Sequence, residues 1–471
     1  MMRCIFYLSA TLLIVLNVNA QQTSRVLTLQ QCIDSAVKNS IEVQRRTLQV
    51  DAAAVDHAQA KSNLLPSLNG SVNHGTNQGR SIDPFTNTYI NQTVNYANYG
   101  LGSDMILFNG LNLRNQIKQA TYAKNASKAD WQQSKDFVTL SVILAYLQVL
   151  SNEDLVALAK QQVEVTRQQV ERLEKLNKEG AISPPLLYDL KGQLKEGELN
   201  IVNSLNAWRT SLLQLTQLMN VPFSEDYKLE KIDNANALAP YTATSSEVYE
   251  NALEQMGAVK AAEWRKKSAA YAVKATKGLL YPTIFLSGNA NTNYSSAAMQ
   301  EKLINTTEVP TSDYVLINGV KTPVVVRQPT FSSERIGYNT QLKNNIFYGI
   351  GVGLRVPIFN SFQTRNRIRL ATIEYKSSML VEEGTKRQLR QEVEQAYLNM
   401  TNAWDRYKIS IEQVAAYAES FRAAEVRFNA GVGTSVDYLI AKNNLDRANL
   451  NLVMTRYDYV LRKQILDYYN R

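Results

Sequence analysis

The sequence predicts a mixed α and β fold made of two similar halves, each with bilayer-length strands and one very long helix. Residues 108–121 recur at 359–372 with seven of fourteen positions identical, where ordinary composition gives about one. Each copy follows an alternating, glycine-containing run and precedes roughly seventy residues of helical periodicity. The repeated stretch therefore marks a strand-to-helix junction that the chain uses twice. The junction residues are Phe108, Asn109, Gly110, Phe359, Asn360 and Ser361.

An offset of 251 residues also relates positions beyond this motif, because Gly180 corresponds to Gly431 and Lys191 corresponds to Lys442. We interpret this correspondence as an internal two-fold sequence repeat. The expected organisation is a signal peptide over 1–20, a first repeat over 21–222, a polar linker over 223–245 and a second repeat over 246–471.

The N-terminus is typical of a secretory signal peptide. Arg3 precedes a short apolar core at 8–16, and Ala20 ends a small-residue cleavage site. A retained anchor is the alternative, and the shortness of the core disfavours it. Cleavage would leave Cys32 as the only cysteine, which excludes a disulfide framework and a thiolate zinc site. No later run of 18 apolar residues stands out, so no membrane-spanning helix is expected.

The charge balance is basic, with 51 Lys and Arg against 42 Asp and Glu, and loss of Arg3 with the signal peptide would leave a net charge of +8. An exported protein does not meet nucleic acid, and no compact basic patch with interleaved aromatic residues stands out. Charged residues look spread along the helices, so we expect ordinary solvated faces.

Each half is expected to begin with a helix that ends at a proline and is followed by two strands. In the first half these are a helix over 28–65 ended by Pro66, strands near 67–73 and 97–107, and a polar loop over 77–94. In the second half they are a helix over 246–280 ended by Pro282, and strands near 284–291 and 346–358.

The strand at 346–358 has the clearest alternation, with Ile350 and Leu354 on a bulky face and glycines on the other. In a soluble sheet the bulky face would meet a core, whereas in an outer-membrane barrel it would meet lipid. Four strands are too few to close a membrane barrel, and an open edge in lipid leaves unpaired backbone groups. Several chains would therefore share one barrel. Candidates for an aromatic girdle are Tyr89, Tyr96, Tyr99, Tyr294 and Tyr348.

The second strand pair is separated by 35 more residues than the first. This extra length contains three prolines, and Asn318-Gly319 within it predicts a small hairpin. In a barrel, the loop over about 295–345 would be extracellular, where insertions are tolerated.

Long helical patterns follow the two junctions, at 111–178 and 362–429. The second carries apolar residues stepping by three and four from Leu389 to Phe428, which is typical of a coiled-coil seam. Nearly seventy residues at 1.5 Å each span about 100 Å. Return helices are expected at 184–219 and 435–469.

Tight, glycine-containing turns are expected between each long helix and its return helix. Gly180 is suited to end the first long helix, and Thr434 and Asp437 have the spacing of a capping box. The turn residues are Gly180, Ala181, Ile182 and Ser183 in the first half, and Gly431, Val432, Gly433, Thr434 and Ser435 in the second.

The residues offer little for catalysis. His57 and His74 have no acid or nucleophile at a recognised spacing, and the glycines at 349, 351 and 353 alternate along a strand instead of forming a phosphate-binding loop. We therefore expect no enzyme activity, no catalytic residue, no cofactor and no metal site.

In this order and spacing, the duplication, Pro66 and Pro282, the two Phe-Asn junctions and the turn at 431–439 resemble the TolC-like outer membrane efflux protein family, the outer membrane factors. The resemblance covers nearly all of the mature chain. It implies a homotrimer in which four strands per chain form a twelve-stranded transmembrane β-barrel, continued by an α-helical coiled-coil barrel through the periplasm. It implies an exit channel for efflux or type I secretion, located in the outer membrane.

The resemblance also implies partners: a periplasmic adaptor protein, an inner-membrane transporter of the RND or ABC type, and outer-membrane lipid, with no nucleic acid. Asp437 matches an aspartate-lined pore constriction near the helix tips, alongside its capping role. The turn residues named above would form the tips that dock the adaptor. The sequence departs from the family at Gly433, where an arginine is usual, and at Leu186, where an acid can occur.

Two other classes of protein share single features with this sequence. A periplasmic adaptor has a helical hairpin but carries compact β-domains in place of bilayer-length strands. A secreted coiled-coil structural protein would not need the glycine-lined strand at 346–358.

Overall fold

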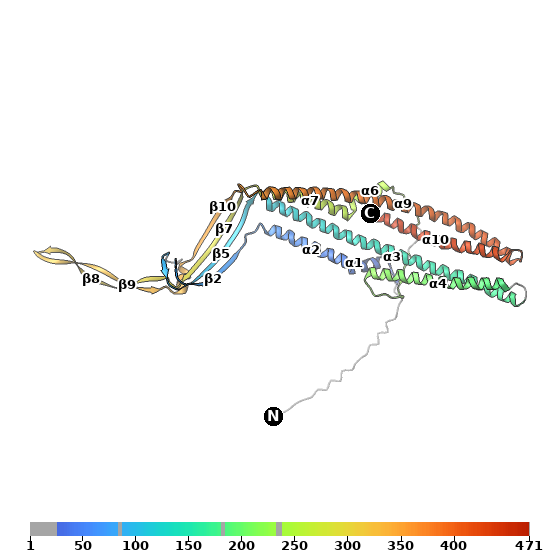
Figure 1. The fold of residues 1–471 in the computed structure, drawn as a ribbon, viewed down its shortest axis with the longest axis horizontal. Coiled ribbons are helices and arrows are strands. Elements are labelled where there is room, and N and C mark those ends of the chain that lie inside the picture. The colour runs from blue at the N-terminus through green and yellow to red at the C-terminus, as the bar shows by residue number, and fades with distance from the viewer. Residues whose placement is uncertain (1–25, 83–86, 180–183, 232–237, 471) are drawn as a thin grey trace, which may run out of the picture. The chain divides into compact units, whose positions relative to one another are not determined.

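The computed structural model describes residues 26–82, 87–179, 184–231 and 238–470 (Figure 1), and it divides into two compact units. The helical unit contains the chain up to Val50, Ala126–Glu263 and the chain from Val381 onward. The sheet unit contains Asp51–Asn125 and Trp264–Leu380.

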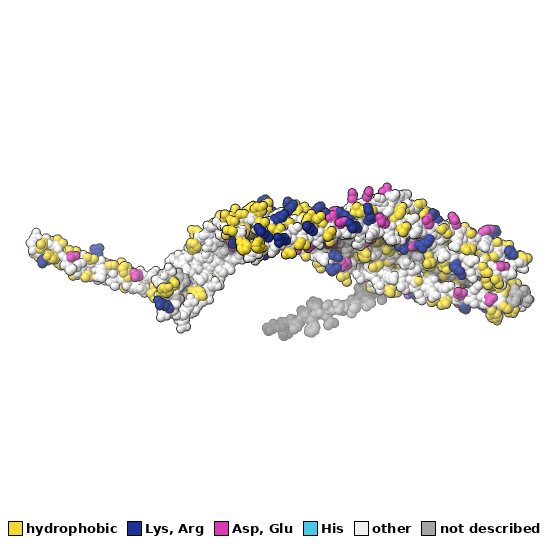
Figure 2. All heavy atoms as spheres, turned by 45° about the horizontal axis from the view of Figure 1, so that its top comes forward, with side chains coloured by type: hydrophobic (Ala, Val, Ile, Leu, Met, Phe, Trp, Pro, Cys, Tyr) yellow, Lys and Arg dark blue, Asp and Glu magenta, His cyan; other side chains and the backbone are white. Residues whose placement is uncertain are grey.

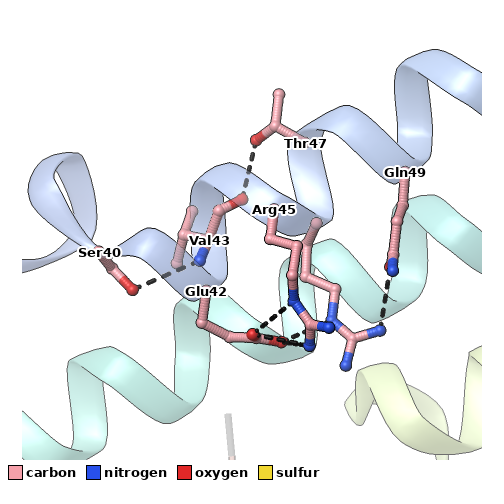
Figure 3. A network of polar contacts seen from close by, with 7 residues as sticks. Ser40, Glu42, Val43, Arg45, Thr47 and Gln49 are labelled. Atoms are coloured by element: carbon pink, nitrogen blue, oxygen red, sulfur yellow. Dashed lines mark hydrogen bonds and ion pairs between the residues drawn. The ribbon is translucent and has the colours of Figure 1, made fainter.

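The helix expected over 28–65 is two helices, α1 (Leu29–Asn39) and α2 (Ile41–Ser62). The chain turns at Ser40, whose ψ of 119° is extended, and the Ser40 hydroxyl accepts the backbone N–H of Val43 at 3.3 Å. Beyond this cap, the Glu42 carboxylate accepts hydrogen bonds from Arg45 and Arg46 across the first turn of α2 (Figure 3). A hydroxyl that caps the next helix makes the break favourable.

The second half has the same break. The helix expected over 246–280 is α6 (Ser245–Gln255) and α7 (Gly257–Gly278), separated by Met256 with ψ of 125°. Thr28 and Thr244 cap α1 and α6 with complete capping boxes. An offset of 216 residues relates α1 to α6 and α2 to α7 at both ends.

The long helices and return helices agree with the sequence expectation to within about two residues. Their bounds are Asn112–Lys178 for α3, Pro184–Met219 for α4, Gln363–Asn429 for α9 and Ser435–Tyr469 for α10. The seam of α9 is buried from Leu389 to Ala403, where it packs against α6 and α10. Further along, Ile411 is 45% exposed, so the seam is only partly covered within one chain.

One expectation about hydropathy is wrong. Among the helices in the described part of the chain, α3 contains an 18-residue window that is apolar enough to cross a membrane by length and composition. Val142, Tyr146 and Leu150 in α3 are buried in the core of the helical unit. Burial in this core accounts for part of the apolar window, of which 44% is buried.

The linker between the halves is not only polar loop. Its β6 (Lys228–Leu229) pairs in parallel with β1 (Val26–Leu27), and the hydroxyl of Tyr146 lies 2.7 Å from the carbonyl oxygen of Glu230. Asp154 of α3 accepts hydrogen bonds from Arg456 at 2.5 Å and from the Tyr457 hydroxyl at 2.8 Å. These contacts fix the middle of α3 against the linker and α10.

The sheet unit contains a four-stranded antiparallel sheet in the order β10-β7-β5-β2 (Figure 1). Its strands are β2 (Asn69–Asn77), β5 (Val94–Asn109), β7 (Thr283–Ser295) and β10 (Phe347–Arg355). Within the described residues, β2 and β10 each pair on one side only, so the sheet has two open edges. β10 is shorter than the strand expected at 346–358 because Pro357 has no N–H to continue the ladder.

The insert in the second half is larger in structure than the small hairpin expected. β8 (Met299–Ile317) and β9 (Val320–Arg335) form one long antiparallel hairpin, followed by α8 (Tyr338–Asn344). Its turn lies where the sequence indicated, with Asn318 at φ 52° and Gly319 at φ 82°. The polar loop of the first half also contains a short hairpin, β3 (Arg80–Ile82) with β4 (Tyr89–Asn91).

Candidate functional site

The turn between α9 and α10 is a glycine-dependent helix tip. Gly431 adopts φ of 75°, a left-handed conformation that side chains other than glycine rarely adopt. The N–H groups of Val432 and Gly433 both donate to the carbonyl oxygen of Arg427 at 3.0 Å, which closes the end of α9. A Cβ atom on Gly433 would lie 3.0 Å from the backbone nitrogen of Phe428, so the turn is tight on its inner side.

α10 begins at an N-cap that involves Asp437. The Thr434 hydroxyl accepts the backbone N–H of Asp437 at 3.1 Å and donates to the Asp437 carboxylate at 2.7 Å. The N-cap at Thr434 is therefore observed, but the expected capping box is incomplete, because the Asp437 carboxylate accepts from the Thr434 hydroxyl and not from the Thr434 backbone N–H. The carboxylate is also well placed to interact with the N-terminal dipole of α10.

Apolar and aromatic side chains lie on both sides of this turn. Tyr438 is buried and stacks on Phe428 with ring centroids 4.9 Å apart, and burial raises the pKa of Tyr438 to about 12. Val432, Val436 and Ile440 are instead 73%, 60% and 56% exposed. Aromatic side chains thus pack inside the tip, and aliphatic side chains are exposed on its surface.

The tip also contacts the first helical hairpin. The Arg172 guanidinium of α3 donates to the Asn429 side chain at the end of α9. Leu186 packs at a small core formed by Val170, Leu173, Leu187 and Leu190, to which Phe428 and Leu439 also contribute. Leu186 therefore has a packing role at the tip. The first turn, Gly180, Ala181, Ile182 and Ser183, lies outside the described residues.

The two strand-to-helix junctions share an unusual backbone. Gly110 and Leu111 have φ of 62° and 63°, and the matching Ser361 and Phe362 have φ of 52° and 60°. The Asn109 side chain accepts the N–H of Leu113, and the Asn360 side chain donates to Thr364. Two consecutive left-handed residues and an asparagine thus turn each strand into its long helix.

The junctions also bring helices together. The buried side chain of Asn112 donates to the carbonyl oxygen of Ala275 at 2.6 Å, which joins α3 to α7. In the second copy, Phe359 and Phe362 pack edge to face with ring centroids 5.5 Å apart.

The faces of β10 differ as the sequence predicted. Tyr348, Ile350 and Leu354 are 79%, 86% and 65% exposed, so the bulky face is uncovered in one chain. On the other face the Phe285 ring lies over Gly353, where a Cβ atom would collide with it. Of the proposed girdle, Tyr99 and Tyr294 both contact Tyr338 of α8, through a hydroxyl pair and packed rings respectively.

Beside the sheet, the exposed charged residues of the helices are almost all basic. The seven residues nearest the sheet in α2, α3, α7 and α9 hold eight cations and a single acid, Asp56. We call these cations the basic collar, and Figure 2 shows Lys and Arg side chains gathered there. The basic collar comprises Lys61, Arg114, Lys118, Lys274, Lys277, Arg365, Arg367 and Arg369.

No arrangement for catalysis or metal binding emerges from the described part of the chain. His57 is half-buried near the end of α2, and its pKa is lowered by desolvation and by the nearby Lys61 and Lys124. No group of three or more His, Cys, Asp and Glu side chains gathers in a metal-binding arrangement within the described ranges. Cys32 is buried, and burial raises the pKa of its thiol to about 11.

Comparison with known proteins gives a consistent result. The family model for outer membrane efflux proteins matches residues 32–221 and 248–467. The chain is 22% identical over 447 residues to the outer membrane efflux protein BepC of Brucella suis, which covers 92% of this chain and 83% of BepC. It is 24% identical over 439 residues to the outer membrane protein TolC of Vibrio cholerae, and the match covers 92% of this chain and 88% of TolC.

Solved structures show the same fold. CusC superposes with a TM-score of 0.73 at 15% identity, over 94% of this chain and 90% of CusC. VceC of Vibrio cholerae superposes with a TM-score of 0.72 at 15% identity, over 94% and 96%. With the family model matched over most of its length, this chain belongs to the outer membrane efflux protein family.

Proposed function

We propose that three copies of this outer-membrane efflux protein share one transmembrane β-barrel and form an exit channel for efflux or type I secretion. The observation that carries the proposal is the sheet in the order β10-β7-β5-β2, which has two open edges and an exposed bulky face on β10. In lipid, the unpaired groups of these edges must be satisfied, and pairing β10 of one chain with β2 of the next does so. Three chains would supply twelve strands.

The proposed domain organisation is two efflux repeats, 21–222 and 246–471, joined by the linker at 223–245 and preceded by a signal peptide at 1–20. Support comes from the separate matches of the family model to 32–221 and 248–467. The equal lengths of α3 and α9, 67 residues each, support the same division. We infer that the helices from three chains complete a coiled-coil barrel in the periplasm.

The proposed partners are a periplasmic adaptor and, through it, an inner-membrane transporter of the RND or ABC type. The exposed aliphatic side chains Val432, Val436 and Ile440 at the tip are suited to dock an adaptor. Asp437 lies in the first turn of α10, and three copies in a ring would disfavour anions in a narrow entrance. Asp437 and Ile440 are three residues apart on α10, so the proposed constriction and the docking surface would be neighbours at the tip.

Drug sensitivity of cells that depend on this protein tests the docking role. Gly431→Trp forces a bulky side chain into a left-handed position at the tip, where a Cβ atom meets open space within the chain. We expect the variant to reach the outer membrane normally and to lose resistance. Gly319→Trp, also at a left-handed glycine with open space, is the matched control and should retain resistance. Full resistance with Gly431→Trp would exclude the tip as the docking surface.

A further inference from the structure

The basic collar is a concentration of charge that the fold itself does not require. Its eight cations come from four helices whose ends lie next to the sheet in a single unit, and all eight side chains are exposed. Arg114 lies in the first turn of α3 and Arg365 in the first turn of α9, and neither first turn contains an acid. Cations are unfavourable near helix N-termini because of the helix dipole. Helix stability therefore does not explain the cations at the starts of α3 and α9, whereas Lys61 and Lys277 lie in the last turns of α2 and α7, where the dipole favours a cation.

Pairing within the chain does not explain the basic collar either. Throughout the described ranges, no carboxylate forms an ion pair with any of the eight cations. Three of the eight lie over aromatic rings instead. Lys118 and Lys274 lie 5.3 and 4.5 Å from the centre of the Tyr271 ring, and Arg365 lies 5.6 Å from that of Phe362. The positive field reaches His57, whose pKa is lowered in part by Lys61. The cations of the basic collar are therefore free of carboxylate partners within the described residues and are available to an anionic ligand.

Apolar surface adjoins these cations. A cavity of about 160 Å³ at the second junction is lined by Leu279, Leu280, Ile358, Phe359 and Phe362, with Arg365 at its edge. Ile358 and Phe359 are 94% and 73% exposed. Cations beside exposed aliphatic and aromatic side chains are the combination found where proteins meet the boundary between lipid tails and head groups.

We propose that the basic collar binds the phosphate groups of anionic lipids in the membrane leaflet next to the helices, with acyl chains against the apolar junction surface. The inference rests on the proposed membrane-spanning sheet, since that sheet would place the helix ends at the head-group level. Charge complementarity identifies the occupant, because eight cations with one acid attract an anionic surface and repel a cationic one. Three chains would present twenty-four such cations around one barrel.

The test compares binding of phosphatidylglycerol and phosphatidylcholine with identical acyl chains to the purified full-length protein in detergent. The collar variant combines Lys277→Gln, Arg365→Gln and Arg369→Gln. The control variant removes the same charge from exposed positions of the helical unit, with Lys160→Gln, Lys175→Gln and Arg427→Gln. We expect the native protein and the control variant to bind phosphatidylglycerol more tightly than phosphatidylcholine. In the collar variant, the ratio of the two affinities should be at least tenfold smaller.

Three results would overturn the proposal. The first is an equal preference in the collar variant and the control. The second is displacement of phosphatidylglycerol by millimolar inorganic phosphate but not by chloride at the same ionic strength, which indicates a site for soluble anions. The third is a shift of ion selectivity in planar bilayers of the collar variant with its lipid preference unchanged, which indicates that the cations face the lumen. Absence of any conductance in the native protein would instead contradict the proposed channel, so the two failures are distinguishable.

Discussion

Gly110 and Gly278 are packed backbone to backbone where β5 turns into α3 and α7 ends. A Cβ atom on Gly278 would lie 2.7 Å from the carbonyl oxygen of Gly110, and one on Gly110 would lie 2.7 Å from the Cβ of Tyr281. Gly110 also has φ of 62°, so both its conformation and its surroundings require glycine. The first junction is thus fixed more tightly than its counterpart at Ser361.

This relationship predicts different outcomes for equivalent substitutions in the two halves. Gly110→Ala should lower the free energy of unfolding by about 2 to 4 kcal/mol, from left-handed strain and overpacking together. Ser361→Gly at the matching position should leave stability unchanged or raise it by up to about 1 kcal/mol, because it relieves a left-handed serine. Thermal unfolding of the purified proteins measures both. Equal stability of Gly110→Ala and the native protein would contradict the tight junction.

The exposed bulky face of β10 predicts that a charged side chain placed on it destabilises the assembled barrel. Ile350→Arg places a cation on a face that is proposed to meet lipid, which should destabilise the assembled barrel by about 2 to 4 kcal/mol at mid-depth. Gly351→Ser, the control on the opposite face, leaves room because a Cβ atom there would lie 3.8 Å from the Ser287 hydroxyl. The fraction of heat-resistant oligomer recovered from outer membranes is the measurement. Normal recovery of Ile350→Arg would show that this face does not meet lipid.

The hairpin β8–β9 is proposed to be extracellular. An epitope inserted between Asn318 and Gly319 lengthens an exposed turn whose residues already have positive φ, so folding and export should be unaffected. Antibody should label intact cells. Labelling that requires a permeabilised outer membrane would reverse the orientation of the sheet.

The charge of Asp437 predicts an effect on ion selectivity. Asp437→Asn keeps a side-chain oxygen that can accept from the Thr434 hydroxyl, and the backbone cap at 3.1 Å does not depend on the charge. Cation preference in planar bilayers should fall while stability changes little. Asp313→Asn in β8 makes the same charge change far along the chain and should leave selectivity as in the native protein. Unchanged selectivity of Asp437→Asn would confine Asp437 to its cap.

The long helices could be predicted from sequence because their periodicity is uninterrupted and their ends carry glycine, proline and capping residues. α9 begins and ends within one residue of its expected range. The breaks at Ser40 and Met256 were missed because one residue with an extended ψ leaves the surrounding apolar pattern intact. The extent of β8–β9 was missed because its three prolines argue against strands. Both strands of a two-stranded hairpin are edge strands. A proline there removes no hydrogen bond between the strands when its backbone nitrogen points away from the partner strand.

The candidate site was predictable in part. The tip turn and the N-cap at Thr434 follow from local residue types, and the junction turns follow from a motif that occurs twice. The basic collar was not predictable in the same way, because its members lie in four segments between Lys61 and Arg369. Only the antiparallel pairing of β2, β5, β7 and β10 brings the ends of those helices to the same end of one sheet.

Single-channel recording of the purified mature protein in planar lipid bilayers, combined with native mass spectrometry of the same sample, tests the proposed shared barrel most directly. The sheet with two open edges predicts discrete conductance steps from a species with the mass of three chains. A soluble monomer that produces no conductance steps would contradict it.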